Sequence, residues 1–91
     1  MSIPYKITWE TDPQGQAVTL LLNGRFGADS LADLERDIFR ARQAQREVVL
    51  DLSEVTLIDR KSAQFLADQT VNDVKLVNCP GYLQRWITRD I

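Results

Sequence analysis

The segment from Val48 to Leu66 constrains the fold more than any other part of the chain. It opens with VVLDL at 48–52, a short apolar run rich in β-branched residues, which is typical of a central strand buried on both faces of a partly parallel sheet. A helix is expected to begin after Asp59, whose carboxylate is suited to cap first-turn N–H groups, and to end before Asn72. A strand that leads into a helix in this way predicts a right-handed crossover.

The residues before this segment predict a hairpin. YKITWE at 5–10 alternates between apolar and polar residues, the period-2 pattern of a half-exposed edge strand. DPQG at 12–15 has the chemistry of a turn, and QAVTLLLNG at 16–24 is expected to return beside the first strand. Trp9 lies on the apolar side of the first strand, so we expect its ring to fill the core.

Helices and one further strand are expected in the rest of the chain. A first helix is predicted from Asp29 or Ser30, because Ser30 with Asp33 resembles a capping box. Its inner stripe would comprise Leu31, Leu34, Ile38 and Ala41. VKLVNC at 74–79 predicts another parallel strand, and residues 82–91 predict a short amphipathic helix. The resulting fold class is α/β, a small mixed sheet formed by an N-terminal hairpin and parallel strands, with helices packed on it.

Length, charge and composition limit the classes of function and partner that are expected for this chain. A chain of 91 residues is expected to form one domain spanning 1–91. Its net charge of −2 is a poor basis for holding a phosphate backbone, so nucleic acid is not an expected partner. No apolar run is long enough for a signal peptide or a bilayer span, which favours a cytoplasmic location without direct membrane insertion.

The residue types also argue against catalysis and cofactor binding. The chain has no histidine and a single cysteine, so an intrachain disulfide and the usual zinc ligand sets are not expected. The carboxylates of Asp51, Glu54 and Asp59 are expected on a strand, in its following loop and at a helix cap, where polar residues have structural roles. We therefore predict no catalytic residues, no metal site and no cofactor, and hence no enzyme.

Residues 48–66, VVLDLSEVTLIDRKSAQFL, resemble a segment of STAS domains (sulfate transporter and anti-sigma-factor antagonist). In those domains an apolar strand is followed by Asp-Leu-Ser, by apolar residues, and then by Asp-Ser-Ser-Gly at the start of a helix. The predicted order of strands and helices also fits that fold. The tail LVNCPGYLQRWI looks like that of small single-domain bacterial relatives, so the resemblance implies such a member with a variant Asp-Ser-Ser-Gly motif.

The variant motif bears on the function that this resemblance implies. In antagonist members, a kinase that is also the anti-sigma factor phosphorylates the second serine, and the unmodified protein binds that kinase and frees the sigma factor. Matched position by position, Asp59 is the Asp, Arg60 and Lys61 replace the two serines, and Ser62 replaces the Gly. Because Lys61 has no hydroxyl, the usual serine phospho-switch is not expected, and Ser62 is left as a candidate phosphorylation site.

The implied role is that of a regulatory or scaffold domain in bacterial signalling, similar to an anti-sigma-factor antagonist. The expected partner-binding residues are Asp59, Arg60, Lys61, Ser62, Arg25 and Asp29. Arg60 and Lys61 are either solvated cations beside an acidic cap or a fixed positive charge that meets an acidic partner constitutively.

The partner is left open between two classes. The first class is a protein like an anti-sigma factor or kinase. The second is the ATPase of an ABC-type membrane transport complex, of which this chain would be a small cytoplasmic accessory subunit. Two further alternatives are formation of a homodimer and binding of a small ligand at the loops that carry the expected partner-binding residues.

Overall fold

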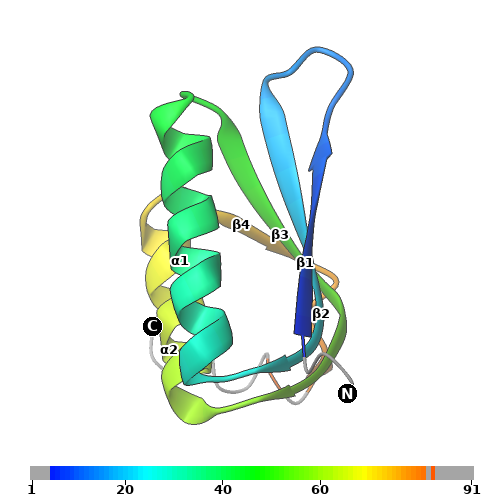
Figure 1. Ribbon diagram of the computed structural model, residues 1–91, viewed down its shortest axis with the longest axis vertical. Coiled ribbons are helices and arrows are strands. Elements are labelled where there is room, and N and C mark those ends of the chain that lie inside the picture. Colours follow the sequence, from blue (N-terminus) through cyan, green and yellow to red (C-terminus); the bar gives the residue numbers. More distant parts are fainter. Residues whose placement is uncertain (1–4, 82, 84–91) are drawn as a thin grey trace.

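In the computed structural model, residues 5–81 and 83 are described, and they form one four-stranded sheet with two helices (Figure 1). The elements are β1 (Tyr5–Thr11), β2 (Ala17–Phe26), α1 (Ala28–Gln43), β3 (Glu47–Ile58), α2 (Arg60–Val71) and β4 (Lys75–Val77). This arrangement confirms the predicted α/β class. The helix predicted over 82–91 lies outside the described residues, apart from Leu83.

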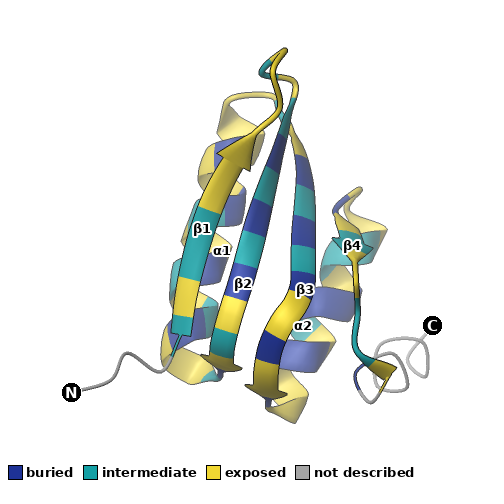
Figure 2. Ribbon diagram, turned by 90° about the vertical axis from the view of Figure 1, so that its right-hand side faces the viewer, coloured by how far each residue is buried: buried dark blue, intermediate teal, exposed yellow. Residues whose placement is uncertain are grey.

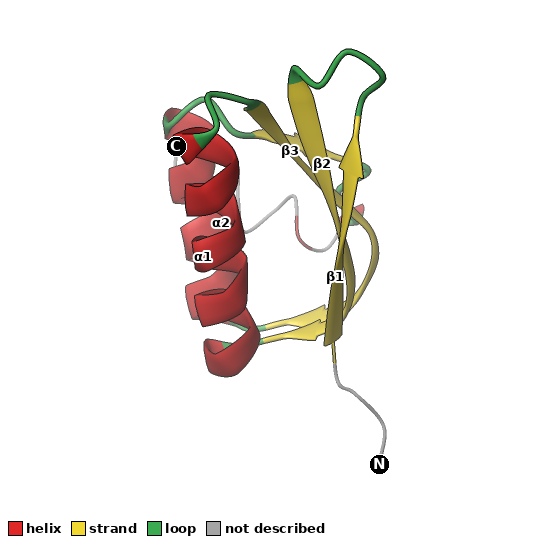
Figure 3. Cartoon of the chain, turned by 45° about the horizontal axis from the view of Figure 1, so that its top comes forward, coloured by secondary structure: helices red, strands yellow, loops and turns green. Residues whose placement is uncertain are grey.

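The sheet has the order β1-β2-β3-β4, with β1 antiparallel to β2 and the other two pairs parallel. The predicted hairpin, the edge position of β1 and the two crossovers are therefore confirmed. Both crossovers move across the sheet in the same direction, and right-handed connections of this kind place their helices on the same face. α1 and α2 accordingly form one layer on one side of the sheet, and no described helix covers the other side (Figure 3).

Strand β3 differs from its prediction in length and in burial. It runs to Ile58 instead of ending at Leu52, so Glu54 lies in the strand and not in a loop. Its buried residues alternate with half-buried ones: Val48, Leu50 and Leu52 are buried, whereas Val49 and Asp51 are not (Figure 2). The prediction of a strand buried on both faces is wrong because helices pack against only one face.

Gly24 and Gly27 were together expected to end strand β2, and the strand continues through Gly24 as far as Phe26, just before Gly27. Gly24 has a φ of 95°, a conformation that suits glycine, and the register with β3 shifts between Gly24 and Arg25. The glycine therefore forms an irregularity within the strand and does not end it. This irregularity allows β2 and β3 to remain paired up to Phe26 and Ile58.

The start of α1 is built differently from the predicted capping box. The helix begins at Ala28, with Gly27 as N-cap, and the Ser30 hydroxyl accepts a hydrogen bond of 2.7 Å from the Gly27 N–H. Asp33 does not cap the helix. Its carboxylate accepts hydrogen bonds from the Tyr5 hydroxyl and, at 3.0 Å, from the Arg36 guanidinium, and so joins β1 to α1.

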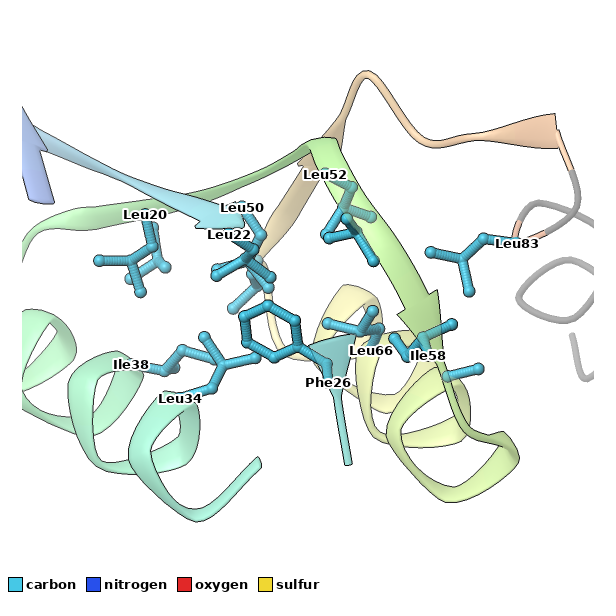
Figure 4. Packing of buried hydrophobic residues seen from close by; sticks show 14 of the residues in the cluster. Leu20, Leu22, Phe26, Leu34, Ile38, Leu50, Leu52, Ile58, Leu66 and Leu83 are labelled. Carbon is cyan, nitrogen blue, oxygen red and sulfur yellow. The ribbon is translucent and has the colours of Figure 1, made fainter. Parts of the chain in front are cut away.

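The core lies between the sheet and the helix layer, where apolar side chains from both layers point toward one another (Figure 4). It includes Leu20, Leu22, Phe26, Leu50, Leu52 and Ile58 of the strands and Leu34, Ile38 and Leu66 of the helices. In α1, Ser30 is buried and Leu31 only half-buried, so the predicted stripe was one position off at its start. Trp9 is 40% exposed, and its predicted burial is wrong because the helices pack mainly on the strands beyond β1.

Two leucines of β3 provide a direct test of this core. Leu50 is 0% exposed and Leu57 is 55% exposed. Leu50→Ala is expected to lower the free energy of unfolding by about 2–5 kcal/mol, because it removes buried methyl groups and leaves a cavity. Leu57→Ala is the matched control and is expected to change it by about 0.5 kcal/mol or less. Equal losses in urea denaturation would contradict the assigned burial.

Candidate functional site

The two helices begin side by side at one edge of the sheet. Strands β2 and β3 are parallel neighbours, so their carboxyl ends lie at the same edge, and each leads directly into a helix. The Asp59 N–H donates to the Phe26 carbonyl at 3.2 Å, which links the two strand ends just before α1 and α2 start. We call the exposed residues here the helix-start surface; it consists of Arg25, Asp29, Leu57, Asp59, Arg60 and Lys61.

Asp59 caps α2, as predicted, and also lies close to the start of α1. Its Oδ1 accepts a hydrogen bond of 2.8 Å from the Ser62 N–H. Its Oδ2 is 3.5 Å from the position that a Cβ on Gly27 would take. The carboxylate thus lies where the positive dipole ends of both helices favour a negative charge.

The pKa of Asp59 is lowered from its ordinary value. The Ser62 hydroxyl and the Ser62 N–H lower it most, desolvation opposes them, and the charge of Lys61 lowers it further. The Ser62 Oγ is close enough to lower this pKa, but it makes no hydrogen bond of standard length and angle. Asp59 is therefore charged near neutral pH and is held in place mainly by the backbone of α2.

Ser62 lies beneath the helix-start surface and is only 1% exposed. It occupies the third position of α2, as Ser30 does in α1, but the two hydroxyls differ in their partners. The Ser30 hydroxyl accepts from the N-cap N–H of Gly27, whereas the equivalent N–H of Asp59 is used by the Phe26 carbonyl. Phosphorylation of Ser62 stays a prediction, and its burial disfavours access by a kinase.

The other predicted partner-binding residues do come together on the surface. Arg25 lies at the end of β2, Asp29 in the first turn of α1, and Arg60 and Lys61 in the first turn of α2, all exposed. Among the described residues the ion pairs are Arg36–Asp33 and Lys75–Glu47, so none of the three cations of this surface is paired there. Three basic side chains, two acidic ones and two helix N-termini give the surface a positive balance.

Leu57 is a member of this surface that sequence reasoning missed. It pairs in register with Arg25, is 55% exposed, and lines a cavity of about 330 Å³ with residues of both strand ends. The remaining lining residues are Arg25, Phe26, Gly27, Ile58 and Asp59. The sequence carried a signal for this exposure, because Leu57 and Ile58 are adjacent and apolar. Successive side chains of a strand point to opposite faces, so only one of the two can point into the core.

The three carboxylates weighed for catalysis do not form one site. Asp51 accepts hydrogen bonds from the Ser53 N–H at 3.0 Å and the Asn78 side chain at 3.3 Å, and so joins β3 to the segment after β4. Partial burial raises the pKa of Asp51, but these hydrogen bonds outweigh it and the net shift is downward. Asp51 and Asp59 thus both stabilise local backbone, and Glu54 is exposed on β3.

Replacement of the N-cap tests the role of Asp59. Asp59→Ala is expected to lower the free energy of unfolding by about 0.5–2 kcal/mol, because a first-turn N–H of α2 loses its acceptor. Asp68→Ala, at an exposed position of the same helix, is the control and is expected to change it by about 0.5 kcal/mol or less. Urea denaturation near pH 7 measures both values. Equal effects would contradict the capping role.

The same carboxylate makes a prediction about pH. Because folding lowers the pKa of Asp59, its charge stabilises the fold above the unfolded-state pKa of about 3.9, and this contribution is lost as the pH falls through the folded pKa. Asp59→Asn keeps a cap acceptor but does not titrate. The stability difference between wild type and this variant should therefore shrink as the solution is acidified from about pH 6 to pH 3. A stability difference that stays constant over this pH range would contradict the lowered pKa of Asp59.

Within the described part of the chain, no helix has the length and apolar character needed to cross a membrane. No protein family model matches the sequence, and neither does any of the curated proteins compared with it. Among solved structures, the chain matches the crystal structure of an anti-sigma-factor antagonist, a STAS domain from Rhodobacter sphaeroides, with a TM-score of 0.62 and 26% sequence identity. The match covers 81% of this chain and 86% of that one. The fold of this chain is therefore that of a STAS domain.

Proposed function

We propose that the protein is a non-catalytic regulatory domain that binds a protein partner through its helix-start surface. The similarity to an anti-sigma-factor antagonist supports this class of function. The observation that carries the proposal is the exposed Leu57 beside cations that form no ion pair among the described residues. We place this activity in bacterial cytoplasmic signalling, in keeping with the resemblance and the composition.

Leu57 supplies the apolar centre of the proposed interface. A half-exposed leucine beside a shallow cavity is suited to be covered by a partner side chain, because interface energy concentrates in a few well-packed apolar contacts. The backbone beneath it is held by strand pairing, since β2 and β3 remain paired up to Phe26 and Ile58. The partner would therefore meet a preformed surface and lose little entropy in ordering it.

The charges around Leu57 indicate the chemistry of the partner. Arg25, Arg60 and Lys61 are exposed, and the positive ends of α1 and α2 add to their field. Asp29 and Asp59 offset only part of this charge, and Asp59 is engaged in capping α2. An acidic protein surface would be attracted to this edge of the sheet and oriented by it.

We further propose that this docking does not depend on phosphorylation at the start of α2. The exposed positions 60 and 61 carry an arginine and a lysine, and the serine at 62 is buried. A phosphoserine in this turn would bring negative charge, whereas these side chains bring positive charge that no kinase removes. The partner would consequently be bound constitutively, with affinity set by its own surface and by ionic strength.

Charge reversal tests the proposed interface. The immobilised wild-type chain is used to capture proteins from the source cells, and the protein enriched by wild type is identified, purified and titrated. Arg60→Glu combined with Lys61→Glu is expected to weaken its binding at least tenfold, because attraction to an acidic surface becomes repulsion. The identity of the captured protein then separates a sigma-factor regulator or kinase from a transporter ATPase.

The matched control is Lys6→Glu compared with Lys61→Glu, because both lysines are exposed and only one belongs to the helix-start surface. Lys6→Glu should bind the partner like wild type. If both single variants lose binding equally, the effect is one of net charge. If the double reversal at 60 and 61 leaves binding intact, the helix-start surface is not the docking site.

A further inference from the structure

A second exposed apolar surface lies between α1 and α2, away from the helix-start surface. Phe39 is 61% exposed and lines a groove of about 380 Å³ with the buried Ile38 and the half-buried Phe65. Polar side chains complete the lining: Glu35, Arg42, Gln43 and Gln69. Phe39 is about 16 Å along the helix axis from the start of α1, so this groove is separate from the strand ends.

Of the charged residues of α1, Glu35 and Arg42 line the groove, and they flank Phe39. Glu35 precedes it by four residues and Arg42 follows it by three, so all three lie on the same face of the helix. Both charged side chains are exposed, and neither forms an ion pair within residues 5–81 and 83. They are about 10 Å apart along the axis, too far to pair with each other.

We propose that this groove is the contact between two copies of the chain, with the two α1 helices packed antiparallel about a two-fold axis near Phe39. A two-fold interface uses the same patch on both copies, so a residue before the axis faces a residue after it. Glu35 of each copy would then face Arg42 of the other, and the two Phe39 rings would cover each other's groove. A parallel arrangement would instead bring like charges together, which is unfavourable.

The proposed contact is small. One helix face per copy buries less than the roughly 800 Å² per partner of a standard interface, so the dimer should dissociate in a concentration-dependent way. This proposal is independent of the one made for the helix-start surface, because it involves other residues and a different partner.

Sedimentation equilibrium of the full chain over a wide concentration range provides the first test. Wild type should show a reversible monomer–dimer equilibrium, and Phe39→Arg should weaken association at least tenfold by burying a charge beside Phe65. Val71→Arg is the control, because Val71 is 80% exposed but does not line the groove; it should associate like wild type. Circular dichroism confirms that both variants fold. A wild-type chain that stays monomeric, or a Phe39→Arg chain that still dimerises, would overturn the proposal.

Charge exchange tests the antiparallel geometry. Glu35→Arg and Arg42→Glu should each weaken self-association roughly tenfold, because two symmetric ion pairs become repulsive. An equimolar mixture of the two variants should regain association, since positions 35 and 42 are both basic in one chain and both acidic in the other. The double variant, with both charges exchanged, should also self-associate. If neither the mixture nor the double variant associates, the antiparallel arrangement is wrong.

Discussion

The parallel pairing of β2 with β3 is the constraint on which the rest of the structure depends. It brings the carboxyl ends of both strands to one edge of the sheet, and the hydrogen bond from the Asp59 N–H to the Phe26 carbonyl fixes them there. The two helices must therefore start side by side. Asp59 stabilises this arrangement because its carboxylate caps α2 and lies close to the N-terminus of α1.

Local sequence patterns were sufficient to predict the hairpin, the parallel strands and the helix that Asp59 caps, since each depends on residues close together in the chain. Features that depend on distant pairing were not predictable in the same way. The continuation of β3 to Ile58 and the irregularity at Gly24 arise from the register with the neighbouring strand. The exposure of Trp9 depends on where the helix layer ends. In the candidate site, the exposed charges could be predicted from the sequence. The exposure of Leu57 could be predicted only with the knowledge that β3 extends to Ile58.

The single helix layer gives the molecule two separate surfaces with different chemistry. The helix-start surface combines one exposed leucine with a positive balance of charge and is suited to an acidic partner. The groove beside Phe39 combines apolar lining with one acid and one base and is suited to a copy of itself. In an antiparallel pair of α1 helices the two helix starts would point to opposite ends of the dimer. Both helix-start surfaces would then remain accessible, and the dimer would offer two copies of the proposed docking site.

Mapping of the bound partner on the domain by NMR tests the central claim most directly. In a titration of the isotope-labelled chain with its purified partner, the account predicts that chemical-shift changes cluster at residues 24–30 and 57–62, the two places where a strand passes into a helix. It also predicts little change on the open side of the sheet away from these two strand ends, at residues 5–11, 17–20 and 47–51. Changes concentrated at those residues, with residues 24–30 and 57–62 unaffected, would contradict the account.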